Sequence, residues 1–396
     1  MTEKLYHNDS YMIDFEAEVV SIEKSKDGYL VKLNKTAFYP TSGGQLFDTG
    51  MIKDCPVVNV ISENDEIIHI VKDSLDIRAG ELVPCHIDWE RRRDNMQKHT
   101  GQHILSQAFV RACTAETVSA RLGEDDSTID LNTANLSDED IHRAEILANQ
   151  IVFENRPVSV SYIPGDRLKE LPLRKIPDRS ESEYRIIEVD GFDWSACGGT
   201  HCKSTGSVGM IKIIGLEKIR STIRLRFLTG FGALEDYHWR LEQIENISNL
   251  LTRHGRETEA AVIQLLDERD SYRRQVSSLK KSMLPGLIED WISKTQMISG
   301  VKVVAIYLEG NDFNEAKGAA LGIINKYPAA AIIGMNDKLV VAVNKETKLS
   351  ASDIIKKAVE IYGGKGGGSP QIAQGGGFRP EDLQVLIAHP EKVLDI

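Results

Sequence analysis

The sequence predicts an α+β protein of several domains, because different hydrophobic patterns follow one another along its 396 residues. Alternating apolar residues dominate residues 1–88, for which we expect a β-barrel domain. Helical spacing is mixed with strand-like runs over 89–230, and a purely helical linker is expected over 231–290. Strands and helices alternate over 291–396, as in a small α/β domain. A chain of this length exceeds one ordinary core, so division into domains is expected.

The first segment contains two hairpins and one further strand, with a glycine-rich insertion between the hairpins. The predicted strands cover residues 13–22, 29–33, 57–61, 67–71 and 82–87. Asn64-Asp65 supplies the turn of the second hairpin. The insertion, FYPTSGGQLFDTG at 38–50, contains a proline and paired glycines that exclude regular structure across it.

The second segment begins where the spacing of apolar residues becomes helical. Asp88 can cap a helix that runs from Trp89 to about Ala112. Ser137 opens a capping-box-like sequence for a second helix, which ends near Asn155. Strand-like runs follow at residues 158–163, 185–189, 208–214 and 223–228.

The last two segments are expected to be a helical linker and a small α/β domain. Two helices separated by His254-Gly255 fill the linker; an antiparallel pair is the simplest interpretation, and a spacer without a binding role is the alternative. The α/β domain is predicted to contain strands over 301–308, 329–334 and 338–343 and helices over 313–326, 351–361 and from Pro380. The glycine-rich stretch at 363–377 lies between regular elements, which favours a folded loop over a flexible linker.

Composition indicates a globular protein without a membrane segment, since 41% of the residues are hydrophobic and 27% are charged. The apolar runs are strand-sized, and the first residues contain no signal-peptide stretch. We therefore expect a cytoplasmic location, where the five cysteines stay reduced and metal binding is a better role than a disulfide framework. The net charge of −11 counts against a nucleic-acid partner, although basic clusters such as Arg91-Arg92-Arg93 permit one locally.

Two short motifs together predict one zinc ion per chain. His99 and His103 lie four residues apart on one face of the predicted helix, so both rings can reach the same ion. In CGGTH at 197–201, two glycines allow a tight turn that directs Cys197 and His201 to one point. Three imidazoles and one thiolate form a ligand set that suits tetrahedral zinc.

These motifs leave the chemistry of the zinc site open. Thr100 stands where a helical zinc protease carries its general-base glutamate, so that class is excluded. Four protein ligands normally make a closed structural site, whereas a catalytic role requires a loose ligand or a fifth coordination position. The residues alone do not distinguish the two roles.

In their order and spacing, FYPTSGGQLFDTG, HTGQH and CGGTH resemble the editing domain of alanyl-tRNA synthetase. The similarity continues through residues 223–230, and the stretch at 363–377 resembles the DHH-associated domain that ends the synthetase. Ser42 and Leu46 depart from the family pattern, which often has glycine and proline there. Since neither an aminoacylation domain nor an Asp-His-His motif is expected, the chain is similar to free-standing alanyl-tRNA editing proteins of the AlaX type, in their long form.

The resemblance implies a hydrolase that removes serine, or glycine, from mischarged tRNA for alanine. It implies that the two histidine-containing motifs supply the zinc ligands, that Gln45 lies near the substrate, and that the Thr41 hydroxyl meets the serine side chain. Such a hydroxyl would favour serine, because alanine would leave it unpaired at a cost of about 1–3 kcal/mol. Gln45 and the amides of Gly43-Gly44 are expected to hold the developing oxyanion.

Two alternatives and one assembly question remain after this comparison. The chain could be a non-catalytic, zinc-containing tRNA-binding module, or a zinc hydrolase that acts on another ester. In the second case the C-terminal half should be dispensable for activity. By resemblance, residues 231–396 are expected to position tRNA or to form a homodimer. Deacylation of seryl-tRNA with and without a chelator distinguishes these functions.

Overall fold

The computed structural model describes residues 2–26, 28–72, 76–177, 181–295, 297–310 and 312–394. Helices and strands mix along the chain, as the predicted α+β class requires. The chain divides into two compact units, residues 1–249 and residues 250–396, and the finer predicted boundaries after 88, 230 and 290 stay predictions. Among the described residues, no helix combines the length and the apolar composition needed to cross a membrane.

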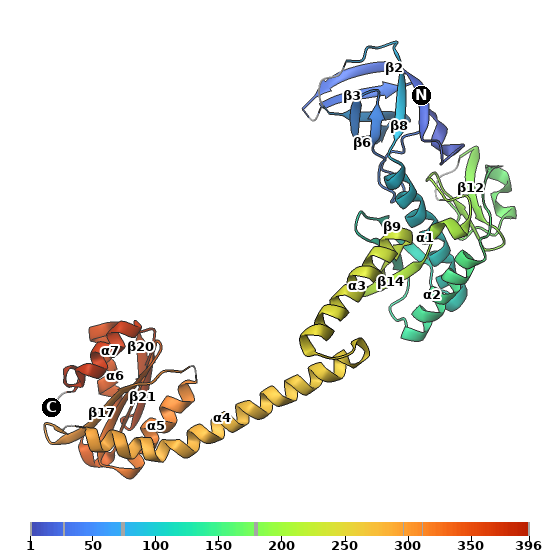
Figure 1. Ribbon diagram of the computed structural model, residues 1–396. Coiled ribbons are helices and arrows are strands. Elements are labelled where there is room, and N and C mark those ends of the chain that lie inside the picture. The colour runs from blue at the N-terminus through green and yellow to red at the C-terminus, as the bar shows by residue number, and fades with distance from the viewer. Residues whose placement is uncertain are drawn as a thin grey trace. The chain divides into compact units, whose positions relative to one another are not determined.

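A closed barrel lies at the start of the first unit (Figure 1). Its strands, in hydrogen-bonded order, are β2 (Asp14–Ser25), β3 (Gly28–Leu33), β7 (Glu66–Val71), β6 (Cys55–Glu63), β5 (Gly50–Ile52) and β8 (Leu82–Ile87). Inward-facing residues such as Val19, Val31 and Val83 are fully buried. Asn64 and Asp65, with φ angles of 48° and 63°, form the predicted turn between β6 and β7.

The glycine-rich insertion runs without helix or strand as far as residue 49, as predicted, and its last residue, Gly50, begins β5. It follows the short strand β4 (Lys35–Thr36), which pairs in parallel with β1 (Glu3–Lys4). An isolated bridge between Ser42 and Gln45 closes the turn at its centre. The insertion therefore forms a fixed loop at one end of the barrel.

Helix α1 (Trp89–Cys113) follows the barrel and carries the first ligand motif. Asp88 caps its start by accepting hydrogen bonds from the main-chain N–H groups of Glu90 and Arg91, as predicted. Nearly every residue from 95 to 106 is buried, polar ones included. Because buried polar groups need partners, the histidines of this helix are expected to be held by side chains from other elements.

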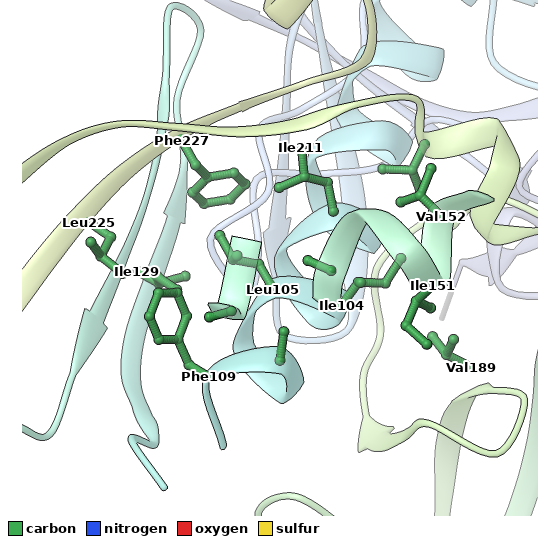
Figure 2. Packing of buried hydrophobic residues seen from close by; sticks show 14 of the residues in the cluster. Ile104, Leu105, Phe109, Ile129, Ile151, Val152, Val189, Ile211, Leu225 and Phe227 are labelled. Atoms are coloured by element: carbon green, nitrogen blue, oxygen red, sulfur yellow. The ribbon is translucent and has the colours of Figure 1, made fainter. Parts of the chain in front are cut away.

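The core around α1 forms against α2 (Asp138–Phe153) and a sheet of strand order β14-β15-β10-β9. These strands are β9 (Thr117–Leu122), β10 (Ser127–Leu131), β14 (Ile211–Ile219) and β15 (Thr222–Thr229). Figure 2 shows Leu105 and Phe109 of α1 beside Ile129 and Phe227 of this sheet. A second sheet contains β11 (Val158–Pro164), β12 (Glu183–Val189) and β13 (Asp193–Ala196), and it ends directly before the second ligand motif.

Strands β9, β10 and β13 lie outside the ranges that the sequence predicted. In β9 only Leu122 is fully buried, so its residues show no clear alternation between apolar and polar. β13 contains only four residues, which is too short for a periodic pattern. β9 and β13 are therefore recognisable only through their partners in the folded sheets, whereas Ser127, Ile129 and Leu131 of β10 do alternate with less buried residues.

The end of the chain forms a sheet with helices on both faces (Figure 1). Its strands, in order, are β16 (Met297–Ile298), β17 (Val301–Tyr307), β18 (Ala329–Met335), β19 (Lys338–Val343), β21 (Ile372–Gly376) and β20 (Lys365–Gly368). The helices that pack on this sheet are α5 (Phe313–Lys326), α6 (Ala351–Tyr362), α7 (Pro380–Ala388) and the end of α4 (Thr258–Lys294). Helix α3 (Gly230–Leu251) follows β15 in the first unit. The stretch at 363–377 forms the β20–β21 hairpin instead of the expected loop.

Alternate residues of β18 face the two helical layers of this domain. Ala330 and Ile332 pack with α6 and α7, whereas Ala331 and Ile333 pack with α5 and the end of α4. The predicted antiparallel pairing of the two linker helices stays a prediction. Short 3₁₀ segments occur at Leu5–His7, Gly165–Glu170, Thr205–Val208, Gly255–Glu257, Lys345–Thr347 and Pro390–Val393.

Candidate metal centre

His99, His103, Cys197 and His201 come together within the first unit. Their candidate ligand atoms all lie within 4.8 Å of one another. The Sγ atom of Cys197 is 3.3 Å from Nε2 of His99 and 3.3 Å from Nε2 of His201. The three imidazole rings have centroids 4.4 to 5.2 Å apart. The two motifs, nearly a hundred residues apart in sequence, therefore form a single cluster.

The dimensions and the donor types of this cluster suit zinc. With bonds of about 2.0 Å to nitrogen and about 2.3 Å to sulfur, a tetrahedral zinc site places its ligand atoms roughly 3.3–3.6 Å apart. The two Sγ–Nε2 separations of 3.3 Å lie at the short end of this spacing, and the four candidate ligand atoms spread over up to 4.8 Å. Imidazole and thiolate are the donors that zinc prefers over the carboxylate sets of magnesium or calcium.

Each imidazole of the cluster is oriented by an oxygen atom on its Nδ1 side. Nδ1 of His99 is 2.8 Å from Oε1 of Gln45, and Nδ1 of His103 is 3.2 Å from Oδ2 of Asp193. Nδ1 of His201 is 3.2 Å from Oγ1 of Thr100. Because these partners engage Nδ1, each ring is left with Nε2 as its metal-binding nitrogen.

The protonation states of the cluster also fit a metal centre. Burial alone would raise the pKa of the Cys197 thiol, but the neighbouring His201 and His103 hold it well below its ordinary value. Burial lowers the pKa of His201 to about 3 and that of His99 well below its ordinary value, so both rings are neutral. Burial would also lower the pKa of His103, but the hydrogen bond to Asp193 raises it. Zinc binding needs a thiolate and neutral imidazoles. The pKa shifts of Cys197, His99 and His201 favour this state, whereas that of His103 favours its protonated form in the metal-free cluster.

The turn after β13 places Cys197 and His201 because its glycines leave room for neighbouring groups. A Cβ atom on Gly199 would lie 2.1 Å from Cε1 and 2.3 Å from Nδ1 of His99, so only glycine fits there. The guanidinium of Arg185 donates to the carbonyl oxygens of Cys197 at 2.7 Å and of Gly199 at 3.0 Å. The turn is therefore fixed from one side by an imidazole and from the other by an arginine.

A cavity of about 530 Å³ opens beside this cluster. His99, His103 and Cys197 form part of its wall. The remaining wall comes from the glycine-rich loop, from β9 and from the segments around β13, and it includes Ser42, Gly43, Gln102, Glu116, Thr117, Ser119, Lys175 and Gly198. The candidate ligands are therefore accessible from a cavity large enough for a small organic group.

Neither Gln45 nor Thr41 is among the described residues of the cavity wall. Gln45 is fully buried, and its side chain contacts His99 and Thr200: Oε1 accepts from the main-chain N–H of Thr200 at 3.1 Å, and Nε2 donates to its hydroxyl at 2.9 Å. Gln45 thus orients the His99 imidazole through its Nδ1 atom. Thr41 is exposed, its main-chain N–H donates to Val60, and it is not among the described residues of the cavity wall.

Sequence reasoning missed three groups that the structure places at the site. Asp193 holds His103 and accepts from Ser195 at 2.9 Å, and it is fully buried. Thr117 and Ser119 of β9 belong to the cavity wall, and their hydroxyl groups donate to Ser106 and Asp130. The Asp-x-Ser-x-Cys sequence before Cys197 is the one local signal that pointed to Asp193.

Family models match three parts of the chain. The model for the threonyl and alanyl tRNA synthetase second additional domain matches residues 184–225, which include the second ligand motif. The model for class II (A) tRNA synthetases matches residues 4–91, the region that folds as the barrel. The DHHA1 domain model matches residues 300–395, which form the C-terminal sheet and its helices.

Whole-chain relatives agree with these matches. Alanine–tRNA ligases of Pyrococcus abyssi and Thermococcus kodakarensis are 30% and 28% identical over 94% and 99% of this chain. The chain spans only 42% and 44% of those ligases. The alanyl-tRNA editing protein AlaX-L of Pyrococcus horikoshii is 31% identical over 100% of this chain and 97% of its own length. This chain therefore belongs to the family of AlaX-L alanyl-tRNA editing proteins.

Proposed function

We propose that this protein is a zinc-dependent aminoacyl-tRNA hydrolase that deacylates mischarged tRNA for alanine in trans. Seryl-tRNA is the main proposed substrate and glycyl-tRNA the second. The name of the Pyrococcus horikoshii relative supports alanyl-tRNA editing. The observation that carries the catalytic role is that His99, His103 and Cys197 line an open cavity. A purely structural zinc site would have no need of a cavity at its ligands.

Zinc, when bound by His99, His103, Cys197 and His201, would supply a Lewis acid beside the ester carbonyl and the attacking water. The residues around these ligands then have positioning roles. Gln45, Asp193 and Thr100 hold the three rings so that each Nε2 faces the common centre. A substrate ester is thus expected to meet a preformed site.

The glycine-rich loop supplies a donor for the negative charge that develops on the ester oxygen. Gly43 lies on the cavity wall, and its main-chain N–H has no hydrogen-bond acceptor in the described parts of the chain. A main-chain amide directed at a developing oxyanion stabilises the transition state. The side-chain amide of Gln45 donates to the Thr200 hydroxyl, and its oxygen faces His99, so the role proposed for Gln45 is to orient that imidazole.

Selection of serine is proposed to depend on Thr117. Its Oγ1 donates to Oγ of Ser106 at 2.7 Å, which leaves its lone pairs to accept a hydrogen bond from a seryl hydroxyl. Alanine offers no such donor, so the difference in transition-state binding would be about 1–3 kcal/mol. Thr41 lacks this position because it is exposed and outside the cavity wall.

Deacylation of seryl-tRNA for alanine tests the proposal directly. His103→Ala should remove both zinc binding and hydrolysis, since one ligand is lost. The matched control is His142→Ala, which changes an exposed histidine on α2 and should leave both properties unchanged. Full hydrolysis by a zinc-free His103→Ala protein would contradict the catalytic role. Hydrolysis of other esters but not of seryl-tRNA would favour the alternative ester hydrolase.

A further inference from the structure

A second cavity, of about 590 Å³, adjoins the metal centre. It shares Lys175, Ala196, Cys197 and Gly198 with the wall of the first cavity. The two cavities therefore meet at the turn that carries Cys197, and Lys175 belongs to both of them. A ligand that filled the first cavity and continued past this turn would pass Lys175 and enter the second.

The junction between the cavities carries two positively charged side chains, Lys175 and Arg185. Lys175 is exposed and forms no ion pair with any residue that the structure describes. Arg185, in the wall of the second cavity, donates Nε to the carbonyl oxygen of His7 and Nη1 to those of Cys197 and Gly199. None of these acceptors is a carboxylate, and the opposite charge that acts most strongly on Arg185 is the Cys197 thiolate. By contrast, Arg174 is paired with Asp193 at 3.1 Å.

The second cavity wall also contains a histidine, His7, which does not add to the positive charge of Lys175. Burial lowers the pKa of His7 to about 4, so this wall residue is neutral at pH 7. The wall also contains the apolar residues Ile176 and Pro177, the largely buried ring of Tyr184 and one carboxylate, that of Glu181. Lys175 has no ion pair within the described part of the chain and lies between two cavities, one of them with a partly apolar and aromatic wall. This arrangement matches the alternation of phosphate and base in single-stranded RNA.

We propose that Lys175 binds the phosphodiester on the 5′ side of the aminoacylated terminal nucleotide, and that the second cavity receives the preceding nucleotide. This inference rests on the proposed function and adds a binding subsite to it. The aminoacyl ribose lies in the first cavity beside the candidate ligands. The turn at Cys197-Gly198 separates the two nucleotides, and the backbone phosphate crosses it next to Lys175.

The subsite is tested with Lys175→Ala and two small substrates that differ only in the phosphate. These are 3′-O-seryl-adenosine and its 5′-phosphate, compared with seryl-tRNA for alanine. Loss of a charge-assisted contact should raise KM for the two phosphate-containing substrates about tenfold with kcat unchanged. KM for 3′-O-seryl-adenosine should not move. Lys175→Arg should restore most of the lost binding, because it keeps the charge.

Lys24→Ala is the matched control, since it removes an exposed lysine from barrel strand β2. If Lys175→Ala and Lys24→Ala give the same KM for seryl-tRNA, or if the phosphate-free substrate is affected equally, the subsite is wrong. If the unchanged protein hydrolyses none of these substrates, the proposed function fails. Binding of a 5′-phosphorylated CCA trinucleotide tests the subsite independently of hydrolysis. Its affinity should fall, and its salt dependence should weaken, in Lys175→Ala but not in Lys24→Ala.

Discussion

The Gly199→Ala substitution tests the close contact between residue 199 and the His99 imidazole in the candidate metal centre. The added Cβ would lie 2.1 Å from Cε1 and 2.3 Å from Nδ1 of His99. Because non-bonded heavy atoms need about 3.5 Å, the imidazole must retreat by more than about 1 Å. That movement stretches the 2.8 Å hydrogen bond between Nδ1 of His99 and Gln45 and withdraws Nε2 from the common centre.

The expected loss of zinc affinity follows from these two changes. Removal of an orienting partner alone costs about 10–100-fold in metal affinity. Since Gly199→Ala also displaces the ligand atom, we expect a loss of at least about 100-fold, or about 2.7 kcal/mol. Competition with a chromophoric chelator at pH 7 measures the affinity, and thermal unfolding checks that the variant is folded.

Gly198→Ala provides the control within the same turn. A Cβ on Gly198 would meet no heavy atom closer than Nε2 of His7, at 3.9 Å. Neither glycine has a positive φ angle, so backbone strain does not separate the two variants. Equal zinc affinities for Gly199→Ala and Gly198→Ala would refute the assignment of His99 as a ligand held against this turn.

Three further predictions concern the groups around the site and the barrel. Gln45→Leu should lower zinc affinity about 10–100-fold through loss of the acceptor for His99, and a chelator titration with an unchanged midpoint would rule out this role. Thr117→Val should lower kcat/KM for seryl-tRNA about 5–100-fold and leave zinc binding unchanged, whereas Thr41→Val should change neither quantity. If Thr41→Val lowers kcat/KM and Thr117→Val does not, the hydroxyl of Thr41 is the group that meets the serine side chain. Burial lowers the pKa of His69 in the barrel to about 4, below its value of 6.5 in an unfolded chain, so its contribution to stability is complete above pH 6.5 and is lost as the pH falls toward 4. Between pH 7 and pH 4, the free energy of unfolding should therefore fall by about 3 kcal/mol more in the unchanged protein than in His69→Gln. Urea unfolding of the first unit measures this free energy, and an equal dependence on pH in the two proteins would contradict the prediction.

Local patterns in the sequence were sufficient for the elements that carry the ligands. The cap at Asp88 and the helical spacing after it predicted α1, and the i, i+4 histidines within it need only one helical turn to converge. The turn between β6 and β7 at Asn64-Asp65 is also a local feature. The meeting of the two motifs was inferred from the chemistry of their side chains, because zinc joins residues that are distant in sequence.

Long-range contacts explain what the sequence did not predict. Asp193 orients His103 across 90 residues, and Gln45 reaches His99 and Thr200 from the barrel. The place of Thr117 depends on β9, whose pairing with β10 has no signal in its own residues. Such positions follow from how sheets and helices pack, which periodicity and local motifs do not encode.

The central claim is tested most directly by measuring hydrolysis of seryl-tRNA for alanine in three states of one preparation. These states are the zinc-containing protein as purified, the protein after a chelator has removed the metal, and the same protein after one equivalent of zinc has been added back. The account predicts that activity disappears with the metal and returns in proportion to zinc up to one ion per chain. Full activity in the metal-free protein, or none in the zinc-loaded protein, would contradict it.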